Sequence, residues 1–201
     1  LLADSVMRCR SAERPPITVH ALPATLDTLR RHIFNGAIWP DFTRLPTTDQ
    51  PILRLQAFQT GDVLQLGARR IEVLPALHTV PAVGFAVLGD RGSWVFTGDT
   101  ERNPAFWRRL NQMNVAALVI ETAFSNREKD LAKRSVHLSP MSLAEELDCI
   151  DKGKSFPIYI THTKPAETGL IMEEIRRFDD TPNRDHDVRH DIRWLSAGQT
   201  F

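Results

Sequence analysis

Residue types that bind metals stand at the ends of three apolar runs in this sequence. His78 closes the run of residues 71–77, and His162 closes the run of residues 157–161. Asp99 lies in a Gly-Asp-Thr step directly after a third apolar run, where a tight turn exposes its carboxylate. Imidazole nitrogen and carboxylate oxygen atoms are ligands for borderline metals such as zinc, iron and manganese. The three residues therefore indicate part of a metal site.

Each of these residues also has a purely structural interpretation. His78 could be a core histidine whose ring nitrogens are satisfied by hydrogen bonds, and Asp99 could be a turn residue, since Gly-Asp is common in turns. The residues after His78 continue as a loop, and binding sites are usually built on loops. About twenty residues separate His78 from Asp99, so both can lie at the same sheet edge.

Glu121, His137 and Lys164 are candidates for catalysis and substrate binding. Glu121 follows a buried apolar run, and its carboxylate needs a partner because an unpaired buried charge is unfavourable. His137 precedes an expected helix and is a suitable partner, since a histidine oriented by a glutamate can transfer protons. His137 could instead be a helix-entry residue bonded to the backbone. Lys164, two residues after His162, could hold an anionic substrate or simply be solvated.

The expected secondary structure changes after Asp99. Before it, short strands bounded by Gly, Pro or Asp cover residues 17–22, 53–58, 62–66, 70–77, 84–88 and 93–97. The steps Gly61-Asp62 and Asp90-Arg91-Gly92 are typical of hairpins. After it, helices alternate with strands, with helices over 104–111, 140–151 and 165–178 and strands over 116–120, 158–160 and 192–195. Further helices are expected over 1–9 and 24–34. This order predicts an α/β protein whose sheets pack face to face with helices outside.

The bulk composition fits one globular domain. The chain has 201 residues, of which 42% are hydrophobic and 25% charged, as is ordinary for a soluble protein. Its 25 Lys and Arg balance 25 Asp and Glu, so no net field attracts polyanions, which argues against a general nucleic-acid binder. No apolar run approaches the roughly 20 residues that a membrane span needs.

The first residue and the cysteines bear on the origin of the chain. It begins with Leu1 rather than Met, and we expect that N-terminal residues are missing, with any targeting signal. Cys9 and Cys149 are too few and too far apart for a disulfide framework or a thiolate zinc site. We therefore expect a reducing, cytoplasmic compartment.

The order of the motifs resembles the metallo-β-lactamase fold superfamily. Members carry a His-x-His-x-Asp-His motif, a His after a strand, an Asp in a Gly-Asp step and a final His, and His78, Asp99 and His162 match the last three. Four further motifs resemble class II cyclic-nucleotide phosphodiesterases over residues 1 to about 178, namely Trp39-Pro40-Asp41-Phe42, Glu121-Thr122-Ala123-Phe124, His137-Leu138-Ser139-Pro140 and Thr161-His162-Thr163-Lys164-Pro165.

The resemblance implies a metallo-β-lactamase-like four-layer αβ/βα sandwich with its site at one sheet edge. We expect residues 1–201 to form a single domain of this type. The His-x-His-x-Asp-His motif does not occur in this sequence. In the family that motif lies just before a helix like residues 1–9, so we expect a domain that is N-terminally incomplete and lacks its N-terminal strands.

The resemblance also implies the roles of the candidate residues. His78 would complete the ligands of one divalent metal, Asp99 would bridge to a second, and His162 would bind the second. Zinc is favoured, although manganese and iron accept the same ligands. A metal-bound hydroxide would attack the phosphorus of a 3′,5′-cyclic nucleotide such as cAMP, and His137, oriented by Glu121, would protonate the leaving 3′-oxygen. Without the motif that supplies the other ligands, the chain should bind metal poorly and be inactive. A homodimer is compatible with the resemblance.

Two alternatives remain open at this point. The motifs at Glu121 and His137 also resemble RNase Z, the tRNA 3′-end endonuclease, or another hydrolase of this fold. RNase Z usually inserts a long arm between its His and Gly-Asp motifs, whereas the short spacing and zero net charge here disfavour a tRNA substrate. The second alternative is a degenerate, metal-free homologue that binds a nucleotide or a partner protein through the same cleft.

Overall fold

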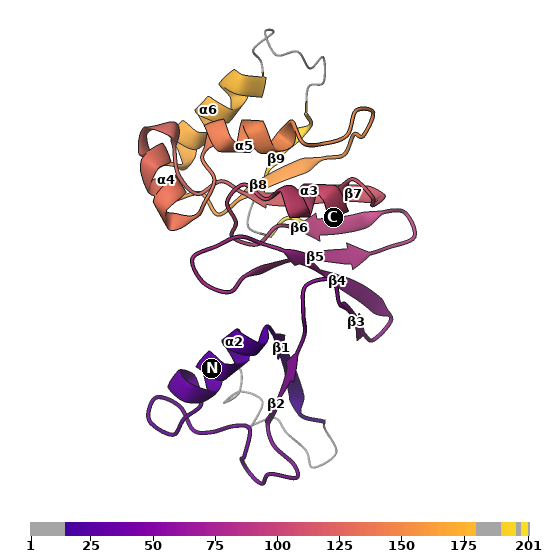
Figure 1. Ribbon diagram of the computed structural model, residues 1–201, viewed down its shortest axis with the longest axis vertical. Coiled ribbons are helices and arrows are strands. Elements are labelled where there is room, and N and C mark those ends of the chain that lie inside the picture. Colours follow the sequence, from indigo (N-terminus) through magenta and orange to yellow (C-terminus); the bar gives the residue numbers. More distant parts are fainter. Residues whose placement is uncertain (1–14, 180–189, 196–197, 201) are drawn as a thin grey trace. The chain divides into compact units, whose positions relative to one another are not determined.

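The computed structural model describes residues 15–179, 190–195 and 198–200. The expected helix over residues 1–9 lies outside these ranges. The chain divides into two compact units, residues 1–59 and 60–201, each with its own sheet in the described residues (Figure 1). The single-domain organisation stays a prediction.

The first unit is a small α/β element. Strand β1 (Ile17–Ala21) pairs in parallel with β2 (Leu53–Ala57). Helix α2 (Pro23–Thr28) lies between them in the sequence and continues into a π-helical turn, η1 (Leu29–Ile33). A small core of Phe42, Ile52 and Leu53 holds the unit together. The helix predicted over 24–34 is therefore present, with its second half wound as a π-helix.

The second unit contains a mixed seven-stranded sheet that positions the candidate site. The strands follow one another in sequence order, from β3 to β9. Neighbours from β3 to β6 pair antiparallel, and neighbours from β6 to β9 pair in parallel. The strands are β3 (Val63–Leu66), β4 (Arg69–Pro75), β5 (Val83–Leu88), β6 (Ser93–Phe96), β7 (Val115–Glu121), β8 (Ile158–Thr161) and β9 (Ile192–Trp194).

Helices of the second unit join and cover the parallel strands. They are α3 (Pro104–Leu110), the 3₁₀ turn η2 (Asn126–Glu128), α4 (Lys129–Ser135), α5 (Pro140–Leu147) and α6 (Thr168–Asp179). Asn103 caps α3 by accepting the Phe106 N–H at 3.2 Å. Ser139 caps α5 in a capping box with Ser142, as the Ser-Pro step predicts.

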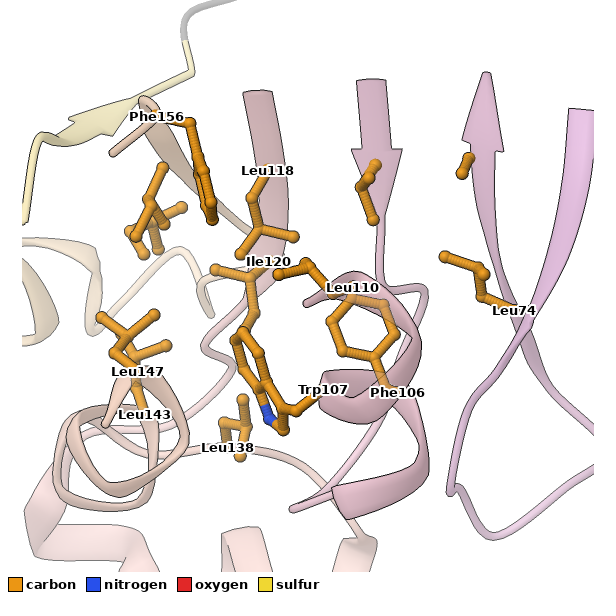
Figure 2. Packing of buried hydrophobic residues seen from close by; sticks show 14 of the residues in the cluster. Leu74, Phe106, Trp107, Leu110, Leu118, Ile120, Leu138, Leu143, Leu147 and Phe156 are labelled. Atoms are coloured by element: carbon orange, nitrogen blue, oxygen red, sulfur yellow. The ribbon is translucent and has the colours of Figure 1, made fainter. Parts of the chain in front are cut away.

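One hydrophobic core joins a face of this sheet to the helices. Alternate residues of the strands, such as Leu118 and Ile120 of β7, point to the same face because the side-chain period of a strand is two. Figure 2 shows these two side chains packed against Trp107 and Leu110 of α3, with Leu147 of α5 nearby. Helix α6 adds Ile171 and Ile175 to the same cluster. The core thus anchors β7, from whose end a candidate site residue emerges.

Two expectations about local structure are corrected. The Gly61-Asp62 step does not join a hairpin between the strands on either side of it, because β2 pairs with β1 and β3 pairs with β4. Instead, Gly61 donates to Val73 and Val73 donates to Asp62, so the step extends the pairing of β3 with β4. The helix predicted over 140–151 ends at Leu147.

The predicted α/β class is confirmed, and so is the hairpin at Asp90-Arg91-Gly92 between β5 and β6. Helix α4 was not predicted. Its sequence, KDLAKRS, holds too few apolar residues to show a helical period.

Candidate metal centre

Four strands bring their candidate residues to one edge of the sheet. Strands β6, β7 and β8 run in parallel, and β4 runs the same way because two antiparallel pairings separate it from β6. The carboxyl ends of these strands therefore meet, which is where open α/β sheets bind ligands. His78, Asp99 and His162 follow β4, β6 and β8, and Glu121 ends β7. The predicted gathering of strand ends is present.

A tight turn at Gly98 delivers Asp99 to this edge. Gly98 has a φ of +66°, and a Cβ at this position would lie 2.5 Å from the carbonyl oxygen of Val83. Glycine is therefore required by the close approach as well as by the backbone angle. Two hydrogen bonds join the residues after Asp99 to Leu77. The Leu77 N–H donates to the Thr100 hydroxyl at 2.9 Å, and the Glu101 N–H donates to the Leu77 carbonyl at 2.8 Å.

His78 is held in one tautomer by the backbone. Its Nδ1 lies 3.1 Å from the carbonyl oxygen of Val136. A carbonyl only accepts hydrogen bonds, so Nδ1 carries the proton and the lone pair of Nε2 is available to a metal. Val136 has a φ of +60°, which is a strained conformation for a β-branched residue. Val136 is the left-handed C-cap of α4, and its carbonyl is the one that contacts His78.

Glu121 is a buried carboxylate with four hydrogen-bond donors around it. The side chain is 1% exposed. Oε1 accepts from the Thr100 N–H at 3.0 Å and lies 2.6 Å from His137 Nδ1. Oε2 accepts from the N–H groups of Ala123 at 3.1 Å and Leu138 at 3.2 Å. The contact with His137 predicted from the sequence is therefore present, and it leaves the Nε2 of His137 available.

The ring of His137 is packed between other rings of the site. Its centroid lies 4.7 Å from that of His78 and 5.2 Å from that of His162, with which it stacks at 25°. Phe124 packs against it edge-on at 5.8 Å. The main chain at His162 has a φ of +62°, and strain of this kind persists where the surroundings over-determine it, often at functional sites.

Ligand atoms of His78, Asp99 and His137 lie within 4.8 Å of one another. The side chain of His162 is not in this group, although its Nε2 lies 3.8 Å from Asp99 Oδ2. Two imidazoles and a carboxylate suit zinc and related metals. The described residues thus contain a His/Asp group that could hold a metal. The division of these residues into metal ligands and catalytic groups stays a prediction.

Lys164 lies beside the group without entering it. Its N–H donates to the carbonyl of Ala123 at 3.1 Å, and its ammonium lies 5.2 Å from the ring centroid of Phe124. Both of these residues come from the Glu121 motif. No role was assigned to Phe124 from the sequence. Its position as an aromatic residue in the motif that follows β7 is the sequence signal for such a role. A role for Lys164 in substrate binding stays a prediction.

No helix in the described parts of the chain has the length and apolar character that a membrane crossing requires.

Known proteins were compared with this chain by sequence and by structure. No family model matches the sequence. A probable 3′,5′-cyclic-nucleotide phosphodiesterase of Yersinia pestis is 27% identical over an alignment of 197 residues. The match covers 81% of this chain and 56% of that protein. The chain spans about half the length of the curated relatives it matches.

Solved structures show the fold. Unliganded yeast PDE1 superposes with a TM-score of 0.72 at 21% identity, covering 95% of this chain and 60% of that one. The metallo-β-lactamase fold protein YhfI of Bacillus subtilis gives a TM-score of 0.62 at 14% identity, covering 87% of this chain and 65% of that one. The chain therefore has the metallo-β-lactamase fold, and its sequence resembles the class II cyclic-nucleotide phosphodiesterases.

Proposed function

We propose that this chain belongs to a metal-dependent phosphodiesterase that hydrolyses 3′,5′-cyclic nucleotides. The observation that carries the proposal is the buried contact between Glu121 and His137, beside His78 and Asp99 at the same sheet edge. Metal-assisted hydrolysis of a phosphodiester uses metal ligands together with a proton donor beside the leaving oxygen, and this edge holds residue types for both. The likeness to the Yersinia phosphodiesterase supports the same reaction.

His78, Asp99 and His162 are proposed to hold divalent metal, with zinc favoured. The geometry suits this role because the Nδ1 of His78 is occupied by a carbonyl and the carboxylate of Asp99 lies near both His78 and His162. The chemistry that two divalent metals supply in such a site is a water of lowered pKa and stabilisation of phosphoryl charge.

His137 is proposed to donate a proton to the leaving 3′-oxygen. The carboxylate of Glu121 fixes the ring by its contact with Nδ1, so the proton is delivered from Nε2. Glu121 itself is held by three backbone N–H groups and does not have to move during the reaction. Breaking the bond between phosphorus and the 3′-oxygen leaves a 5′-nucleotide as the product.

A small cyclic substrate is favoured over tRNA on two grounds. About twenty residues separate His78 from Asp99, which leaves no room for a long RNA-gripping arm between them. The chain has no net charge, whereas binding an RNA backbone depends on an excess of Lys and Arg.

The proposal is tested with the full-length protein and added zinc or manganese. We expect hydrolysis of cAMP and of bis(p-nitrophenyl) phosphate. The His162→Ala variant should lose activity and keep its fold, while His32→Ala, at an exposed position in the first unit, should match the wild type. Failure of the metal-loaded wild type to hydrolyse either substrate would refute the proposal.

A second variant separates the two roles open to His137. If His137 donates a proton, His137→Ala should lose turnover and retain its bound metal, as measured by elemental analysis. Loss of metal together with turnover would make His137 a ligand, as its distance from His78 and Asp99 also allows.

A further inference from the structure

A cavity of about 280 Å³ opens beside His137. Its walls come from residues of α4, residues of α5 and the residues that follow Asp99. His137 is the member of the candidate site that lines it. If His137 donates its proton to the leaving oxygen, as proposed above, the group that this oxygen carries lies near a residue that lines the cavity.

The charges around the cavity are mixed. Lys129 and Lys133 of α4 line it together with Asp130 and Glu101. Arg102 and Glu145, which also line it, form an ion pair with each other at 2.5 Å. Charges of both signs do not form the single-sign surface that would favour a second phosphate or a nucleic-acid strand. They do supply donors and acceptors for the edges of a neutral polar group.

The remaining lining residues point to the same kind of ligand. Ser139 and Ser142, whose hydroxyl groups are engaged in the capping box of α5, lie in the wall, and Met141 contributes an adaptable apolar side chain that is 50% exposed. The volume falls just below the roughly 300 Å³ at which pockets for drug-sized ligands begin. The cavity therefore suits one small moiety rather than an oligonucleotide.

We propose that this cavity binds the nucleoside portion of the substrate, with the base against Met141 and the α4 wall. The inference rests on the proposed function, because the nucleoside is what the leaving 3′-oxygen carries. It assigns recognition of the nucleoside to α4 and α5. Of the candidate metal group His78, Asp99 and His137, His137 alone lines the cavity.

The test is binding of 5′-AMP to the full-length protein by isothermal titration calorimetry. A Met141→Trp substitution fills the cavity from α5 at a half-exposed position, and Lys133→Trp fills it from α4. Each should weaken 5′-AMP binding at least tenfold and leave binding of inorganic phosphate unchanged. The matched control is Leu131→Trp, on α4 but outside the cavity lining, which should bind 5′-AMP like the wild type.

The outcomes separate this inference from the proposed function. Wild-type affinity for 5′-AMP in both cavity-filling variants would overturn the inference, and so would a wild type that does not bind 5′-AMP. Equal weakening of phosphate binding would also overturn it, since the phosphate end would then be what the substitutions disturb. If the wild type hydrolyses neither cAMP nor bis(p-nitrophenyl) phosphate, yet its 5′-AMP binding falls selectively in both variants, the proposed function fails and the nucleoside site stands.

Discussion

Replacing Glu121 by glutamine should destabilise the protein strongly, although the two side chains have nearly the same shape. The carboxylate faces only donors: Thr100 and His137 at one oxygen, Ala123 and Leu138 at the other. An amide replaces one oxygen by an NH₂ group, which is itself a donor. With this group in the place of Oε2, the N–H groups of Ala123 and Leu138 both lose their acceptor. With it in the place of Oε1, the Thr100 N–H loses its acceptor and His137 keeps its bond only by changing tautomer.

The size of the effect follows from this count. A hydrogen bond to a charged group contributes about 1.5–3 kcal/mol, and a buried donor left unsatisfied is comparably unfavourable. One or two lost bonds at a side chain that is 1% exposed therefore predict a loss of about 1.5–6 kcal/mol in the free energy of unfolding. This is a large part of the 5–15 kcal/mol that typically stabilises a folded domain.

The assay is equilibrium unfolding in urea, followed by circular dichroism at neutral pH. The matched control is Glu174→Gln, because Glu174 is half-buried and accepts the Asn126 N–H at 2.8 Å. The amide oxygen of glutamine can still accept that bond, so a loss of no more than about 1.5 kcal/mol is expected for the control. A loss below about 1 kcal/mol for Glu121→Gln would refute the argument that the buried carboxylate organises this edge.

Two further predictions concern a turn and a hydrogen-bonded carboxylate. Gly98→Ala should lower the free energy of unfolding by about 1–3 kcal/mol, because the new Cβ would meet the Val83 carbonyl oxygen. The control Gly153→Ala, at a φ of +89° with open space around it, should lose less stability. Equal losses of stability in thermal denaturation would contradict this prediction. Hydrogen bonding by Ser125 lowers the pKa of Glu167 from its ordinary value of 4.5. The charged carboxylate therefore adds stability above pH 4.5 that is lost as the pH falls through the lowered pKa. The difference in urea midpoint between wild type and Glu167→Gln should accordingly be constant near neutral pH and shrink in acid. A difference that grows in acid would contradict the stabilising role of the charged carboxylate.

The meeting of the candidate residues at one sheet edge could be predicted from the sequence. Apolar runs that end at His78, Asp99 and His162 are visible as short strands, and strands that run in the same direction bring their ends together. The contact between Glu121 and His137 could be predicted because a buried carboxylate requires a partner.

Features that depend on tertiary contacts could not be predicted in the same way. Helix α4 is mostly charged, and it ends at Val136 in a left-handed conformation that usually requires glycine. The two bonds that join Leu77 to the loop after Asp99 use backbone groups of Leu77 and Glu101 and the hydroxyl of Thr100, and the sequence does not show that these residues meet. The cavity beside His137 depends on where α4 and α5 lie, so it could not be anticipated without them.

The most direct test of the central claim is the identity of the product formed from cAMP. The full-length protein with added zinc or manganese should convert 3′,5′-cAMP to 5′-AMP, followed by ³¹P NMR. This product requires breakage of the bond to the 3′-oxygen, which is the atom that His137 is proposed to protonate. Release of 3′-AMP, or the absence of any reaction in the metal-loaded protein, would contradict the account.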